Sequence, residues 1–196
     1  MPAKAEMTIR VPIPPSLPQA SVLSALHAYE PLITANPFVA RFESRPVDVP
    51  SLVSDPFFTS DGLRLQSYIV YDRVPLIPGV VHKAVVIPCT FQSFDAGVRC
   101  RADAAGGVTV RSSYEVRRKG ETPPGDNDET NGRVVGHDGD GEEWELVEKA
   151  RIECASWMKP FVTRSFGTAH KEILERVIKE VEKSVRGEFV NGERWG

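Results

Sequence analysis

The sequence predicts an α+β fold in which a curved antiparallel sheet of about seven strands wraps around a long C-terminal helix, with short helices after the first strand. Three observations support this prediction. Of the 16 prolines, 13 lie at or before Pro88, a density that excludes long early helices. The second half contains consecutive segments in which apolar and polar residues alternate, as they do in strands. A continuous apolar stripe with helical spacing follows near the C-terminus.

Composition bounds the class of protein. The chain has 196 residues, 41% apolar and 26% charged, and we expect one domain over 1–196 with a folded core over 7–185. Its net charge of −3 provides no overall positive field for nucleic acid or an anionic membrane. The longest apolar runs are too short for stable membrane insertion, and the first ten residues lack a signal-peptide core, so we expect a cytoplasmic protein. Three cysteines without a Cys-x-x-Cys pair predict neither a disulfide framework nor a metal site.

The first half of the chain is expected to contain two strands and little helix. Residues 7–14 alternate enough to form a strand. Ser16 can cap a helix that runs to about Tyr29, with Pro18 in its first turn. Prolines at 31 and 37 limit a second helix to a turn or two, residues 38–48 are expected to form a strand, and residues 49–62 a long loop.

The second half is expected to supply the rest of the sheet and its helix. Segments 63–74, 82–94, 97–103 and 108–118 predict four strands, joined by turns at 75–79, 95–96 and 104–107. Residues 142–155 predict another strand, and residues 162–185 predict the long final helix. At 1.5 Å per residue this helix spans roughly 35 Å, which is enough to cross a sheet.

An acidic segment separates the last two strands. Between 120 and 148 the chain has ten acidic residues against one base, Arg133, and residues 120–141 are almost free of apolar side chains. We therefore expect a mobile loop over 120–141. Its DGDGEE run at 138–143 departs from a calcium-binding EF-hand loop, because Glu143 stands at the sixth position and Lys149 at the twelfth.

Strand periodicity indicates which residues face the core. On 142–155 one face is apolar except for a single carboxylate, Glu148, while the other face is mostly charged and is expected to be solvated. The inward positions of neighbouring strands carry small residues, and such a face can leave space for a ligand; these are Cys100, Ala102, Ser112 and Ala150. Tyr114 and Ser112 join Glu148 as polar groups of this candidate cavity. Alternatively, Glu148 pairs with an arginine or a hydroxyl and has only a structural role.

Further candidates are less well placed by the pattern. On 63–74 both alternations mix polar and apolar residues, so either Tyr71 or the pair Tyr68 and Asp72 points inward. His170 flanks the apolar stripe of the final helix and either contacts a ligand or is a packed imidazole with one hydrogen bond. The candidate ligand contacts are accordingly Ser112, Cys100, Tyr68, Asp72, Trp144, Phe166 and His170.

Three stretches resemble a known family. They are YIVYDRVPLIPG at 68–79, AAGGVTVRSSYEV at 104–116 and KPFVTRSFGTAHKEILERV at 159–177. Together with their spacing they resemble a fungal family of START-like domains of unassigned function, within the helix-grip superfamily that includes polyketide cyclases and plant pathogenesis-related allergens. The resemblance implies a deep cavity between the C-terminal helix and the sheet for an apolar or aromatic ligand. It carries over no catalytic residue.

Two functions fit these expectations, and the sequence does not separate them. The first is an enzyme that cyclises, dehydrates or isomerises a small hydrophobic metabolite in secondary metabolism without a metal or cofactor. In that case Glu148 is a general acid or base whose pKa is raised by the apolar face, and Tyr114 or Tyr71 hydrogen-bonds a developing enolate oxygen. The second is a non-catalytic carrier or sensor for a lipid or hydrophobic metabolite. An adaptor with a fully packed inner face is a third possibility, and the oligomeric state is open.

Overall fold

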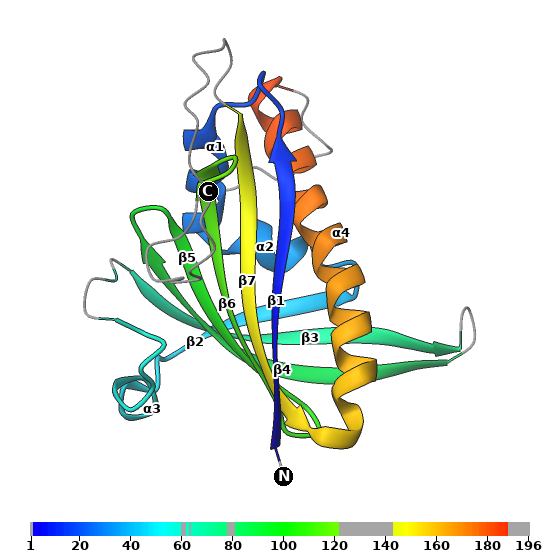
Figure 1. Cartoon of the computed structure of the whole chain (residues 1–196). Coiled ribbons are helices and arrows are strands. Elements are labelled where there is room, and N and C mark those ends of the chain that lie inside the picture. The colour runs from blue at the N-terminus through cyan, green and yellow to red at the C-terminus, as the bar shows by residue number, and fades with distance from the viewer. Residues whose placement is uncertain (1, 60–61, 63, 78–80, 122–142, 188–196) are drawn as a thin grey trace, which may run out of the picture.

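The computed structural model describes residues 2–59, 62, 64–77, 81–121 and 143–187. Within them, seven strands form one antiparallel sheet with the order β1-β7-β6-β5-β4-β3-β2 (Figure 1). The predicted acidic loop at 120–141 lies outside the described residues, apart from Gly120 and Glu121. The strands are β1 (Pro2–Ile13), β2 (Val39–Arg45), β3 (Leu65–Ile77), β4 (Val81–Phe94), β5 (Gly97–Ala104), β6 (Val108–Arg118) and β7 (Trp144–Ala155).

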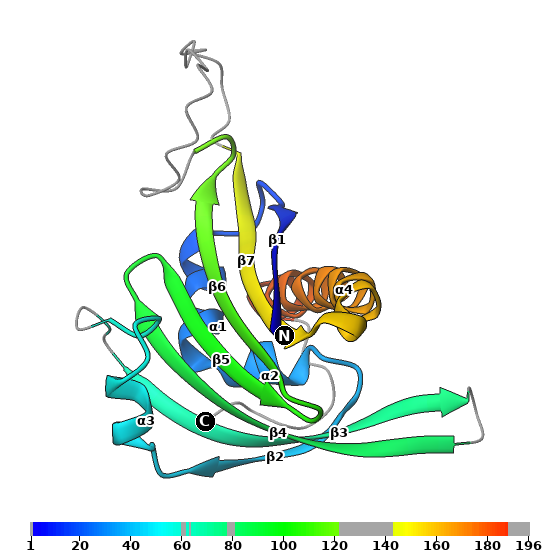
Figure 2. The same cartoon turned by 60° about the horizontal axis from the view of Figure 1, so that its bottom comes forward.

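The sheet is strongly curved, and its first two helices and its long final helix lie on the concave side (Figure 2). Figure 2 shows β1 and β7 beside the final helix α4 (Lys159–Val185), while β2, β3 and β4 cross below it. Helix α4 packs on β1 and β7 and also contacts α1 (Gln19–Ala28) and α2 (Glu30–Thr34). The predicted fold class, a curved sheet on a long C-terminal helix, is confirmed.

The core follows the predicted faces of the strands and of α4. On β7 the inward residues from Leu146 to Cys154 are all nearly inaccessible to solvent. They meet the apolar stripe of α4, whose buried members are Phe166, Ile173, Leu174, Val177, Ile178 and Val181. Since each fully buried aliphatic side chain contributes about 1.5 to 3 kcal/mol, this contact holds the helix on the sheet.

The opposite face of β7 is less solvated than the pattern predicts. Val147 is 1% exposed and Glu145 is 7% exposed, although both lie on the face expected to be in water. Val147 stands between Arg10 of β1 and Glu115 of β6 in the register of the sheet, and Glu145 forms an ion pair with Arg10. The long stems of charged neighbours can cover a valine on a nominally polar face, a contact that alternation alone does not reveal.

Several element boundaries differ from the prediction. Helix α1 begins at Gln19 after Pro18, and no side chain caps it, so the expected cap by Ser16 is wrong. The predicted loop at 49–62 contains a short helix, α3 (Val49–Val53). Strand β1 already begins at Pro2, where it pairs with Ala155, because β7 is long enough to offer it a partner. Strand β3 continues to Ile77, and α4 begins three residues earlier than predicted, at Lys159.

Candidate functional site

Glu148 lies at the centre of β7, on the face that packs against the helices. In the sheet it stands between Ile9 of β1 and Tyr114 of β6. Its side chain is 0% exposed. A carboxylate in such a place costs free energy unless hydrogen bonds satisfy both oxygens.

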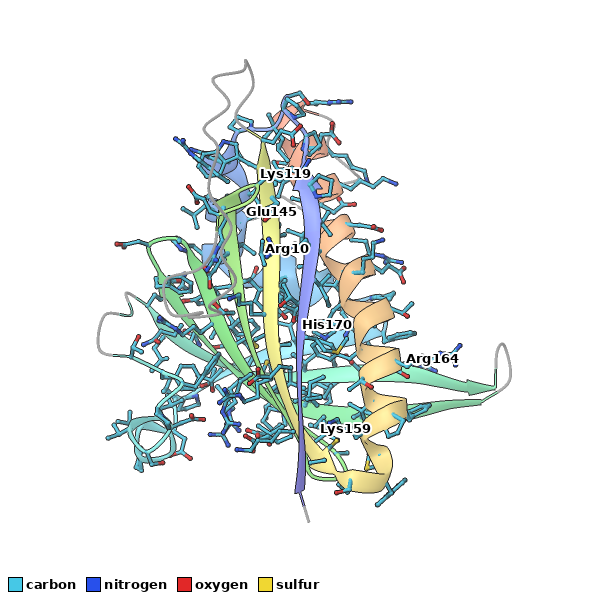
Figure 3. The ribbon with its side chains drawn as sticks, in the orientation of Figure 1. Arg10, Lys119, Glu145, Lys159, Arg164 and His170 are labelled. Carbon is cyan, nitrogen blue, oxygen red and sulfur yellow. The ribbon has the colours of Figure 1, made fainter. Side chains whose placement is uncertain are left out.

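Two side chains meet this requirement. The Ser112 hydroxyl on β6 donates to Glu148 Oε1 at 2.6 Å. His170 on α4 brings Nδ1 to 2.8 Å from Oε1 and 2.9 Å from Oε2. Figure 3 places His170 where α4 passes beside the sheet. We refer to Glu148, Ser112, Tyr114 and His170 as the Glu148 cluster.

The orientation of His170 is fixed from two sides. One turn earlier on α4, Phe166 stacks on the imidazole with ring centroids 3.6 Å apart and an interplanar angle of 19°. Since Nδ1 faces a carboxylate, it is the nitrogen that carries the proton in the neutral ring, and Nε2 then has a free lone pair. No residue in the described part of the chain hydrogen-bonds to Nε2. The His170 side chain is 21% exposed, so this nitrogen belongs to the most accessible member of the cluster.

Tyr114 contributes a neutral phenol. Burial, and then the charge of neighbouring Glu148, raise the pKa of Tyr114 well above its ordinary value of 10.0. Burial likewise raises the pKa of the Cys100 thiol well above 9.0. Tyr114 therefore keeps its proton at neutral pH and can donate a hydrogen bond, whereas Cys100 stays an unreactive thiol.

Tyr68 and Asp72 lie on the inner face of β3, which settles the alternative that the sequence leaves open. Tyr68 is 4% exposed and packs edge-on against Phe42 and Phe91. Asp72 is 5% exposed and accepts a hydrogen bond from Asn36 Nδ2 at 3.0 Å. Its other oxygen, Oδ1, is buried without a hydrogen-bond partner among the described residues. Burial raises the pKa of this carboxyl above 3.8.

Two other candidates are not brought to the Glu148 cluster. Tyr71 lies on the opposite face of β3, where the guanidinium of Arg41 covers its ring at 3.7 Å. Trp144 shares the face of Glu148 but lies four residues away along β7, about 13 Å at strand spacing. Arg118 lies over its indole ring. The structure thus separates Tyr71 from the inner face and places Trp144 at its rim.

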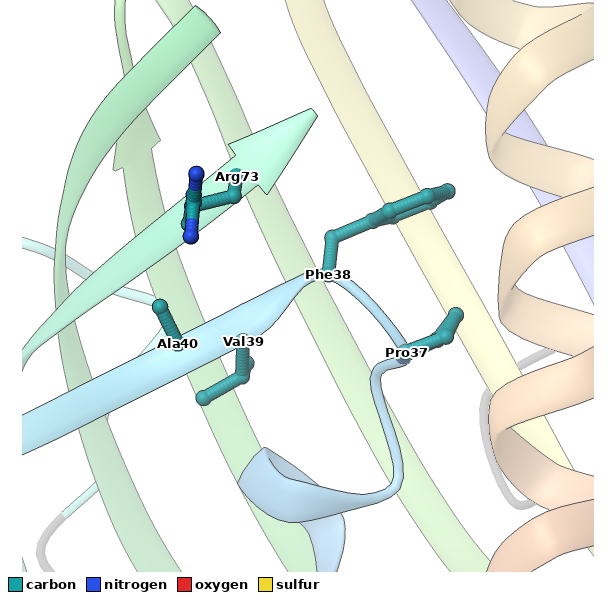
Figure 4. A pocket seen from close by; sticks show the side chains of 5 residues that line it. All are labelled: Pro37, Phe38, Val39, Ala40 and Arg73. Atoms are coloured by element: carbon teal, nitrogen blue, oxygen red, sulfur yellow. The ribbon is translucent and has the colours of Figure 1, made fainter. Parts of the chain in front are cut away.

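A shallow pocket lies elsewhere, at the β2 edge of the sheet (Figure 4). It has a volume of about 450 Å³ and is lined by Pro37, Phe38, Val39, Ala40 and Arg73. None of these residues belongs to the Glu148 cluster. The cavity predicted between α4 and the sheet therefore remains a prediction.

Sequence reasoning missed two features of this site. Asn36 follows a short helix in a polar turn, and nothing in its surroundings marks it as the partner of Asp72. The contact between His170 and Glu148 joins residues of different elements, so no strand or helix period indicates it. Within the described residues, no three His, Cys, Asp or Glu side chains gather to hold a metal ion, and no helix is long and apolar enough to cross a membrane.

Comparisons with known proteins agree with this architecture. A family profile described as "Domain of unknown function (DUF7053)" matches residues 2–183. A comparison with curated protein sequences finds no match.

Solved structures share the fold at low sequence identity. The Zhui aromatase/cyclase from Streptomyces sp. R1128 is 12% identical, with 95% of this chain and 97% of that chain covered and a TM-score of 0.56. The di-domain ARO/CYC StfQ from the steffimycin biosynthetic pathway is 9% identical, with 93% and 52% covered and a TM-score of 0.56. Ara h 8.0201 is 9% identical, with 92% and 99% covered and a TM-score of 0.53. The fold is thus the START-like, helix-grip fold.

Proposed function

Because this chain belongs to the DUF7053 family and has the helix-grip fold, we propose that it binds a small hydrophobic or aromatic metabolite between the sheet and α4. The proteins named above include aromatase/cyclases, which supports a ligand of this kind. The small inward residues predicted from the sequence support a site on the inner face, at positions 100, 102, 112 and 150.

The contact between His170 and Glu148 is the observation that carries the proposal of a ligand site capable of proton transfer. A buried carboxylate that holds one imidazole nitrogen orients the ring and fixes which nitrogen carries the proton. The second nitrogen is then a general base toward a group placed beside it. This assigns the proton transfer to His170 and gives Glu148 a positioning role, in place of the direct acid or base role expected from the sequence.

We infer a cofactor-independent cyclisation, dehydration or isomerisation. His170 Nε2 takes a proton from carbon next to a ligand carbonyl, and the electron pair moves onto the carbonyl oxygen as an enolate. In a cyclisation the enolate carbon adds to a second carbonyl of the ligand, and the imidazolium protonates the new alkoxide. In a dehydration the enolate expels a hydroxyl from the next carbon, which takes the proton from the imidazolium and leaves as water. In an isomerisation the imidazolium returns the proton to another carbon of the enolate system. Tyr114, which stays neutral, is a candidate donor to the enolate oxygen. Asp72 Oδ1 has room for one more hydrogen bond and can accept one from a ligand hydroxyl.

A non-catalytic carrier or sensor is the alternative, and it uses the same inner face. The two functions differ in the role of His170. An enzyme needs this residue to take a proton from the ligand, whereas a carrier needs it only to contact the ligand. We place either activity in the cytoplasm and in fungal secondary metabolism, a proposal that is supported by the sequence resemblance and by the biosynthetic pathway named for StfQ.

Ligand binding is tested first, by native mass spectrometry of gently purified protein and by displacement of the dye anilinonaphthalene sulfonate. Ala102→Leu adds bulk on the inner face and should weaken dye binding about tenfold or more, because a leucine occupies space that the dye needs. Ala40→Leu makes the same change in the shallow pocket at the β2 edge and should leave dye binding unchanged. Loss of binding only in Ala40→Leu would move the site to that pocket.

Catalysis is tested with a bound metabolite identified in this way. His170→Asn retains a donor toward Glu148 but has no basic nitrogen, so turnover should fall by about two orders of magnitude or more while binding is retained. Glu172→Gln, on the exposed side of the same helix, is the matched control. Unchanged turnover in His170→Asn would remove His170 from the mechanism, and a lack of turnover in the wild type would leave the carrier as the function.

A further inference from the structure

Two large aromatic side chains are exposed where β7 passes into α4. Trp157 is 82% exposed and Phe161 is 74% exposed. They lie four residues apart, one in the short 3-10 helix Ser156–Met158 and the other in the first turns of α4. Neither is in the core cluster, and a soluble domain gains nothing from leaving an indole and a phenyl ring in water.

Unpaired cations accompany these aromatics. Lys159 and Arg164 are exposed, and among the described residues neither has an ion-pair partner. Figure 3 shows both on the N-terminal half of α4. From residue 155 to residue 171 the sequence contains no Asp or Glu at all. Three other cations of α4, Lys171, Arg176 and Lys183, are paired, for example Arg176 with Glu172 at 2.6 Å, whereas Lys179 has no ion-pair partner among the described residues.

The turn beside these aromatics is uncharged, and the carboxylates next to it are paired, Asp103 with Arg101 and Glu153 with Lys4 and Arg111. The turn between β5 and β6, with the sequence AAGG at 104–107, lies beside Met158, whose methyl carbon is 3.7 Å from a Cβ built on Gly106. The turn residues have no charge, and those at 105–107 are exposed. We call Trp157, Phe161, Lys159, Arg164 and this turn the aromatic-basic end.

Charge is segregated along the molecule. The strand ends that flank the acidic segment, Arg118 of β6 and Trp144 of β7, lie at the opposite end of the sheet from the start of α4 (Figure 1). That segment and the following strand hold the ten acids counted between 120 and 148. The net charge of −3 is therefore an average over unlike parts of the sequence.

We propose that the aromatic-basic end docks reversibly on an anionic lipid bilayer, with Trp157 and Phe161 in the interface and Lys159 and Arg164 near the headgroups. Trp is enriched at membrane interfaces because its ring is apolar and its N–H is polar, and Phe adds buried apolar area. Each Lys or Arg near an anionic surface strengthens binding about fivefold. This proposal is independent of the ligand site.

The test uses the full chain and vesicles of phosphatidylcholine, either pure or with about one third phosphatidylserine. We expect co-sedimentation with the anionic vesicles at about 0.1 M salt, a blue shift of tryptophan emission, and release at about 0.5 M salt. In a chain that also carries Trp195→Phe, the shift should vanish in Trp157→Phe, because the one remaining tryptophan, Trp144, is already half-buried in the folded protein.

Variants test whether the aromatic-basic end is responsible for binding to the anionic vesicles. Trp157→Ala with Phe161→Ala should lower vesicle partitioning about tenfold or more. Lys159→Gln with Arg164→Gln should lower it about 30-fold at low salt. Since all four side chains are exposed, these variants should melt at the wild-type temperature. The matched controls are Val49→Ala with Val53→Ala, which are exposed apolar residues of α3, and Lys179→Gln on the C-terminal half of α4.

Three results would overturn the proposal. The first is a lack of co-sedimentation with either kind of vesicle. The second is equal partitioning of the wild type and the aromatic double variant. The third is a concentration-dependent dimer that forms without lipid and is lost in the aromatic double variant, which would make a second copy of this chain the occupant of the surface.

Discussion

The buried contact between Glu148 and His170 predicts a large coupling energy in a double-mutant cycle. The cycle compares the wild type, Glu148→Gln, His170→Asn and the double variant by urea unfolding at neutral pH. Glu148 is fully buried and contacts His170 Nδ1 through both oxygens. A hydrogen bond to a charged group contributes about 1.5 to 3 kcal/mol, and we expect the coupling energy in this range. Glu148→Gln alone should cost about 3 kcal/mol or more, because Ser112 also loses its charged acceptor.

An exposed pair on the same helix provides the control cycle. Glu172 and Arg176 are 2.6 Å apart, but their side chains are 50% and 45% exposed. Pairs of this kind in helices contribute about 0.2 to 0.5 kcal/mol, so the control coupling should be several times smaller. A Glu148–His170 coupling no larger than the control would refute the reasoning, since it would mean that the two side chains do not pair in solution.

Three further predictions concern the rest of the fold. Burial raises the pKa of Asp72 in the folded protein above its ordinary value of 3.8. The contribution of this carboxyl to the free energy of unfolding is therefore fully present below pH 3.8, and it is lost as pH rises through the folded-state pKa. Asp72→Asn should therefore gain about 1 kcal/mol over the wild type at pH 7 but not at pH 3.5, as measured by urea unfolding, and an equal difference at both would contradict this. The pKa of Cys89 is raised to about 12 by burial, so it should not react with Ellman's reagent at pH 8 until urea unfolds the protein. Gly97→Ala should lower the free energy of unfolding by about 1 to 3 kcal/mol, because its Cβ would stand 1.8 Å from the Tyr114 carbonyl oxygen, and wild-type stability would show that the hairpin can shift.

The sheet and its long helix were predictable because each depends on a repeating pattern. Alternation placed β5, β6 and β7 within one or two residues and assigned the inner face of β7 correctly. Patterns failed where tertiary contacts decide the outcome. Val147 is buried by its neighbours in the sheet, and β1 begins at Pro2 because β7 pairs with it. Neither effect can be seen in one segment alone.

The site was only partly predictable for the same reason. Periodicity distinguishes Glu148 from the other acids around it, because only this one stands on an apolar face. The identity of its partner depends on how α4 crosses the sheet, which a sequence pattern does not contain. The mixed pattern of β3 left Tyr68, Tyr71 and Asp72 open until the pairing with β2 and β4 fixed their faces.

Glu148 and Asp72, the two carboxylates discussed as inner-face site residues, differ in what they can still do. Both oxygens of Glu148 already accept hydrogen bonds, from Ser112 and His170, and the carboxylate orients the imidazole. Asp72 keeps Oδ1 unsatisfied within the described part of the chain, at a cost that a ligand donor would remove. A bound hydroxyl should therefore stabilise the protein through Asp72, and a basic nitrogen should act through His170. If one ligand does both, Asp72→Asn should weaken binding with little effect on turnover of bound ligand, whereas His170→Asn should do the reverse.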